Sequence, residues 1–171
     1  MAIVTPDIHD TAHADGFFRT LALLMALTMF AGFTLQFARG FSSLSARPIV
    51  HIHGIAFMIW IAIFVTQSCL ATRGPIALHR KLGWFGAFWV VVLVIMGSWI
   101  TIDVIQRGTT PFFFRPQHFL IGNPLSVLVF AGLVYSAIRL RRRPDWHVRL
   151  QICAMTTIMG PAFGRLLPMP C

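Results

Sequence analysis

Five long runs of apolar residues dominate the chain, and short polar segments separate them. The runs cover approximately residues 18–38, 50–72, 82–105, 118–140 and 147–167. Crossing ~30 Å of hydrocarbon takes a helix of ~20 residues, which each run can supply. Backbone polar groups in lipid must be satisfied within the segment, so each run is predicted to be helical. The pattern predicts an all-α polytopic membrane bundle of about five transmembrane helices, with a four-helix core from the second to the fifth.

The polar segments predict a simple domain organisation. Residues 1–17 are polar and acidic and lack the basic region that begins a signal peptide. We therefore expect them to form a polar cytoplasmic tail. Because no later connection is long enough to hold a soluble domain, residues 18–171 are expected to form a single transmembrane helical domain.

Composition and charge support a membrane protein and argue against a nucleic-acid-binding one. The chain is 57% hydrophobic and 11% charged, and its net charge of +9 comes from basic residues in short loops rather than in one patch. Loops on the cytoplasmic side carry an excess of Lys and Arg. One side of the predicted bundle holds nine basic residues and the other holds five, which places the N-terminus in the cytoplasm. The nine are Arg19, Arg73, Arg80, Lys81, Arg139, Arg141, Arg142, Arg143 and Arg149.

Four histidines recur at the ends of the predicted helices. Because successive helices run in opposite directions, His53 and His118 should lie near the outer face, and His79 and His147 near the cytoplasmic face. Two histidines at one depth on facing helices can ligate a haem iron from both sides. The pattern therefore predicts one or two b-type haems, with all four histidines as candidate iron ligands. A haem-free protein with interfacial histidines is the alternative.

Each pair has features that bear on this interpretation. Gly83 and Gly86 fall near the same helical face as His79, where they would either make room for a macrocycle or line an ordinary helix contact. Pro124 suits a first helical turn. If the fourth helix begins there, His118 lies in the preceding loop and has no ligand role. Arg165 is a candidate partner for haem propionates, for lipid phosphates or for Asp103.

Other chemistry finds little support in the sequence. There is no Gly-rich phosphate loop, no HExxH motif and no Ser–His–Asp arrangement, so neither a hydrolase nor a transferase is indicated. Beyond residue 15 the only carboxylates are Asp103 and Asp145. Ion transport normally uses carboxylates inside the membrane, so their scarcity disfavours a transporter. Whether the protein is a redox enzyme stays open at this point.

Two resemblances follow from these motifs. The pairing of the second helix with the fourth, and of the third with the fifth, resembles transmembrane di-haem b-type cytochromes over residues 50–167. The local motifs "HIHG", "LHRKLGW" and "DWHVRL" are more similar to an uncharacterised family of bacterial polytopic membrane proteins with HxHG, HRxLG and HxRL signatures. That similarity implies a fold and little else. Together with the charge distribution, it leads us to expect a multi-pass protein of the bacterial inner membrane. The family pattern lacks His118, and its members often continue with further helices, so an end at Cys171 indicates a truncated or shortened member.

Two functions are compatible with these observations. The first is a cytochrome b-like electron-transfer protein in the membrane, which contacts lipid and takes electrons from a quinol or from a periplasmic reductant. The second is a haem-free accessory or assembly subunit that docks on a larger membrane complex. The short loops fit both functions, and neither involves nucleic acid.

Overall fold

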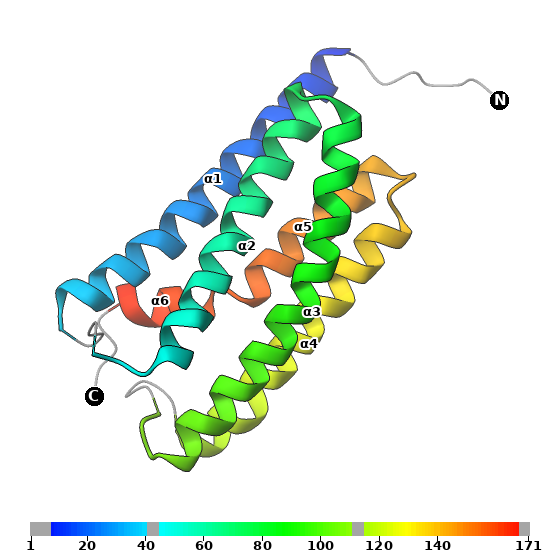
Figure 1. Ribbon diagram of the computed structural model, residues 1–171. Coiled ribbons are helices and arrows are strands. Elements are labelled where there is room, and N and C mark those ends of the chain that lie inside the picture. Colours follow the sequence, from blue (N-terminus) through cyan, green and yellow to red (C-terminus); the bar gives the residue numbers. More distant parts are fainter. Residues whose placement is uncertain (1–7, 41–44, 111–114, 168–171) are drawn as a thin grey trace.

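The computed structural model describes residues 8–40, 45–110 and 115–167, and all regular structure in these ranges is helical (Figure 1). Proline occupies the first position of three of the helices (Pro48, Pro116 and Pro144), where its missing N–H costs nothing and its fixed φ suits the first turn. The helices are α1 (Ile8–Ala38), α2 (Pro48–Arg73), α3 (Ile76–Gln106), α4 (Pro116–Arg139), α5 (Pro144–Thr157) and α6 (Gly160–Leu166).

The helices form an antiparallel bundle in which each long helix packs on the next. Helix α2 contacts α1 and α3, and α4 contacts α3 and α5. Figure 1 shows α5 running back from the end of α4, so that α6 lies beside the C-terminal part of α1. Contacts of α1 with both α5 and α6 close the bundle.

The hydrophobic core draws on α1 as well as on the helices expected to form it. Ala22, Met25 and Met29 of α1 are buried in the same cluster as residues of α2 to α6. The core of the bundle therefore extends beyond the predicted four-helix unit. Its other buried members are Ala56, Trp60, Ile61, Phe64, Val90, Leu93, Phe130, Val134, Ala154, Met155, Ile158, Met159 and Ala162.

Four helices of the described chain are long and apolar enough to cross a membrane: residues Gly16–Ala38 of α1, and the whole of α2, α3 and α4. Large apolar side chains remain exposed on them. On α3, for example, Trp84, Phe88, Ile95 and Trp99 recur at helical spacing and are all exposed. A face of this kind is stable against lipid tails, which suggests a helical membrane protein.

The run predicted over 147–167 consists of two helices rather than one. Helix α5 ends at Thr157, and α6 begins at Gly160. Pro161 explains the break, because its ring would clash with the carbonyl of Thr157 and it cannot donate to it. The intervening residues make tighter turns, with Ile158 N–H bonded to Met155 O and Met159 N–H bonded to Thr156 O. The sequence thus predicts five spanning segments, whereas the structure contains four long helices and a broken fifth segment.

Helices α1 to α5 each begin before their predicted apolar runs, and two of these starts change an interpretation. Helix α1 already starts at Ile8, inside the segment expected to be a polar tail. Helix α4 starts at Pro116, so His118 belongs to its first turn and Pro124 lies inside the helix. The interpretation of His118 as a loop residue is therefore wrong.

Candidate functional site

His79 and His147 meet at the end of the bundle where α2 turns into α3 and α4 into α5. Each is the fourth residue of its helix, α3 and α5 respectively. Their ring centroids are 6.4 Å apart, and the ring planes make an angle of 75°. An imidazole nitrogen binds a first-row metal ion at about 2.0–2.1 Å, so two rings on opposite sides of one ion have centroids roughly 6 Å apart. The separation suits a shared ligand.

The His147 ring is oriented by the backbone of the neighbouring helix. Its Nδ1 lies 2.8 Å from the carbonyl oxygen of Ala137, a completely buried residue of α4. A carbonyl only accepts, so this contact requires the proton on Nδ1, and in the neutral ring the lone pair is then on Nε2. Metal-ligating histidines are commonly fixed by a second contact of this type.

No hydrogen bond of this kind from the described residues holds Nδ1 of the His79 ring. Its Nδ1 is buried and has no hydrogen-bond partner among the described residues. The backbone at His79 is held instead by Gln67 of α2, whose Nε2 donates to the His79 carbonyl at 3.1 Å. One ring nitrogen of this histidine is therefore desolvated and unpaired, which is costly unless a ligand satisfies it.

Gly83 and Gly86 face α2 and allow the two helices to approach. A Cβ on Gly83 would lie 3.0 Å from Gln67 Nε2, and one on Gly86 would lie 3.3 Å from Ile63 Cγ2. Both glycines thus line a tight helix contact, which was one of the two interpretations of the sequence. The space beside them is filled by α2 side chains, so these glycines offer no cradle for a macrocycle.

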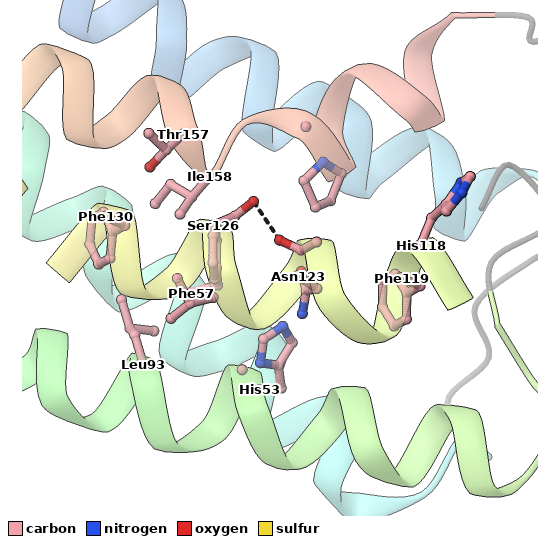
Figure 2. A pocket seen from close by; sticks show the side chains of 15 residues that line it. His53, Phe57, Leu93, His118, Phe119, Asn123, Ser126, Phe130, Thr157 and Ile158 are labelled. Atoms are coloured by element: carbon pink, nitrogen blue, oxygen red, sulfur yellow. Dashed lines mark hydrogen bonds between the residues drawn. The ribbon is translucent and has the colours of Figure 1, made fainter. Parts of the chain in front are cut away.

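His53 and His118 lie at the opposite end of the bundle and do not converge. Both line one cavity, but the figure shows the His118 ring pointing away from His53 (Figure 2). His118 is exposed, whereas the Nδ1 of His53 is buried without a partner in the described chain. The structure therefore brings one predicted pair together and leaves the other apart.

The cavity between α2, α3, α4 and the α5–α6 break has a volume of about 190 Å³. Pockets that enclose drug-sized ligands have volumes of about 300–1,000 Å³, so this cavity is too small for a haem. Asn123 and Ser126 of α4 contribute polar groups, and Phe57 and Phe130 contribute aromatic surface. The sequence placed Phe57 on the helical face of His53, where it could pack a macrocycle or another helix, but it did not distinguish Asn123, Ser126 or Phe130 from ordinary helix packing.

Arg165 of α6 is partly buried beside α1. Its guanidinium carbon lies 4.6 Å from the centre of the Phe33 ring, and its Nη1 donates to Pro161 O at 3.3 Å. The Arg165 carbonyl in turn accepts from Arg39 at 3.4 Å. These contacts give Arg165 a role in holding α6 on α1, and they do not include Asp103.

Asp103 instead joins α2 to the end of α3. It forms an ion pair with Arg47, which precedes α2, and a second one with Arg107 at 3.0 Å. Hydrogen bonding to the Asp103 carboxylate raises the pKa of Arg47 above its ordinary value. The sequence showed that Asp103 is one of few carboxylates, but the partners depend on how the chain returns after residue 45.

No protein-family model matches the chain, and no curated protein and no solved structure shows significant similarity to it. The class of protein is therefore defined by the structure itself: over the described ranges the chain is all-helical and has four helices of membrane-spanning length and composition.

Proposed function

We propose that this protein is a cytochrome b-like electron carrier of the membrane, in which His79 and His147 ligate the iron of one haem. The observation that supports the proposal is the 6.4 Å separation of the two ring centroids. A lone pair on His147 Nε2 and the unpaired nitrogen of His79 agree with it.

The donor set favours haem over a bare metal ion. Among the described residues no group of three or more His, Cys, Asp or Glu side chains could hold an ion. A haem iron needs only two axial ligands from the protein, because the macrocycle supplies the other four. The imidazoles fit that requirement, whereas Gly83 and Gly86 do not contribute space.

A bound haem would supply one-electron chemistry whose potential depends on axial ligands, hydrogen bonds and burial. The chain itself contributes two properties. Ala137 fixes the His147 tautomer, and Gln67 holds the start of α3 against α2. Each property acts on the ligands and needs no further catalytic group.

The proposal includes a location in a bacterial inner membrane, with the N-terminus and the histidine pair on the cytoplasmic side. Its support is the distribution of basic residues, since Arg80, Lys81 and Arg149 lie close to His79 and His147 in the sequence. A quinone or another redox protein would then exchange electrons with the haem.

A haem-free accessory subunit is the second candidate. Its support is the exposed aromatic face of α3, where Trp84, Phe88 and Trp99 could pack on helices of a larger complex. Such a subunit would need no convergence of His79 with His147, and this is why we rank it second.

Pyridine haemochrome analysis and reduced-minus-oxidised spectra of the purified protein test the proposal. We expect about one b-type haem per chain, lost in both His79→Ala and His147→Ala and retained in the matched control His118→Ala. Circular dichroism and gel filtration establish that each variant is folded. Well-folded wild-type protein that takes up no haem, even after incubation with hemin, would overturn the electron-carrier function. Haem that persists in both alanine variants would overturn only the ligand assignment.

A further inference from the structure

The cavity at the α5–α6 break has the size of one aromatic ring. Its volume is about 190 Å³. For comparison, an engineered cavity of about 150 Å³ binds benzene. Phe57, Phe119 and Phe130 line the cavity from two helices, and aromatic side chains pack favourably on an aromatic ligand (Figure 2).

The two hydroxyl groups among the described residues that line the cavity both donate their hydrogens to backbone carbonyls. Ser126 Oγ donates to Gly122 O at 2.8 Å, and Thr157 Oγ1 donates to Ala154 O at 2.7 Å. A hydroxyl has one hydrogen and two lone pairs, so each of these groups offers the cavity only acceptor capacity. Their side chains therefore favour a ligand that donates.

Asn123 adds a further acceptor. The Thr101 hydroxyl donates to Gly97 O at 2.7 Å, so it must accept the bond from the Asn123 amide nitrogen at 2.5 Å. This assignment fixes the orientation of the amide and identifies Oδ1 as its other polar atom. Asn123 thus offers acceptor capacity of the same kind as Ser126 and Thr157.

Two histidines of the described residues line the cavity, and Figure 2 shows the ring of His53 pointing into it and that of His118 pointing away. The Nδ1 of His53 is buried without a partner in the described residues, and Figure 2 shows the His53 ring and Asn123 directed toward one another. A neutral imidazole has one donor and one acceptor nitrogen. A ligand hydroxyl would satisfy His53, whereas an apolar ring would leave it unpaired.

We propose that this cavity binds a hydroxylated single aromatic ring, that is, a phenol or quinol head group, with its hydroxyl directed at His53 and Asn123. The ring lies among the phenylalanines, and the hydroxyl hydrogens meet the acceptors described above. This site is separate from the His79–His147 pair and does not depend on haem binding.

Saturation-transfer NMR titration of the purified protein with 1,4-hydroquinone tests the proposal. We expect saturable binding to the wild type and weaker binding of toluene by about tenfold, the cost of leaving buried polar groups unpaired. Ser126→Leu should fill the cavity, and His53→Leu should remove the titratable group, so each should weaken hydroquinone binding by about tenfold or more. Ser136→Leu is the matched control, because Ser136 makes the same bond to the carbonyl four residues earlier on the same helix but does not line the cavity.

Thr157→Val is a second, nearly isosteric variant that removes one acceptor and should also weaken binding if Ser126→Leu does not fold. Absence of saturable binding would mean that only water occupies the cavity, and this would overturn the proposal. So would equal affinity for toluene, or unchanged affinity in a folded Ser126→Leu variant. Haem content measured on the same samples reports separately on the electron-carrier function.

Discussion

Asn123 of α4 donates a hydrogen bond to Thr101 of α3, whose side chain is completely buried. The Thr101 hydroxyl in turn donates a hydrogen bond to Gly97 O of its own helix. A side-chain hydrogen bond therefore joins α3 and α4 at a point where the surrounding contacts are apolar. In membranes such bonds between helices contribute about 0.6 kcal/mol on average and about 1.7 kcal/mol at most.

Thr101→Val should destabilise the protein by about 1–2 kcal/mol, because it leaves the Asn123 donor without its partner. Unfolding in mixed micelles measures this change. A double-mutant cycle with Asn123→Leu should give a coupling energy of about 0.6–1.7 kcal/mol. Thr28→Val is the control, since Thr28 donates only to Leu24 O of its own helix. Additive effects in the cycle would show that the bond adds no stability.

Gly32→Ala should be the most disruptive glycine-to-alanine change in α1. A Cβ at Gly32 would lie 3.0 Å from Ala162 O and 3.1 Å from Ala162 Cα, and backbone atoms of α6 cannot rotate away. Overpacking of this kind costs about 1–3 kcal/mol. Gly132→Ala is the matched control, because a Cβ there meets nothing within 4 Å.

Thermal unfolding in detergent should separate these two glycine variants. We expect a lower melting temperature for Gly32→Ala and an unchanged or higher one for Gly132→Ala, since alanine favours helix more than glycine does. Equal melting temperatures would contradict a tight contact between α1 and α6.

Asp103→Asn should lower the melting temperature more than Arg107→Ala does. The carboxylate serves both arginines, so its loss breaks both ion pairs, whereas Arg107 is the more exposed partner and leaves the Arg47 pair intact. The difference should shrink in high salt, which screens exposed charges. Equal effects of the two substitutions on the melting temperature would show that the Arg47–Asp103 ion pair adds no stability beyond that of the Arg107–Asp103 pair.

The sequence predicted the helical bundle and the common end of the bundle at which His79 and His147 lie, because these features depend on local patterns. Long apolar runs specify helices, and alternating direction places His79 and His147 at one end. The break at Pro161 could also be expected, since proline cannot continue the helix it interrupts. The start of α4 could not, because Pro116 and Pro124 are both compatible with a first helical turn.

Features that depend on distant packing were not accessible in this way. The sequence cannot distinguish a Gly83 that faces a cofactor from one that faces a neighbouring helix. The close contact between Gly83 and Gln67 of α2 shows that it faces a helix. The pairing of Asp103 with Arg47 likewise requires knowledge of how α2 returns alongside α3. The polar cavity forms where α2, α3, α4 and the α5–α6 break meet, so the sequence of any one of these segments does not reveal it.

If His147 ligates haem iron, imidazole added to the solution should replace its ring in a variant that lacks the side chain. His147→Gly should lose the low-spin spectrum expected of two histidine ligands, because Nε2 is absent, while the helix around Ala137 is otherwise retained. Millimolar imidazole should restore that spectrum by occupying the vacated volume beside the Ala137 carbonyl, which accepts its N–H as it does that of His147. His118→Gly is the control and should show the wild-type spectrum with or without imidazole, since His118 is exposed at the other end of the bundle. A two-histidine spectrum in His147→Gly without imidazole would assign the ligand to another residue.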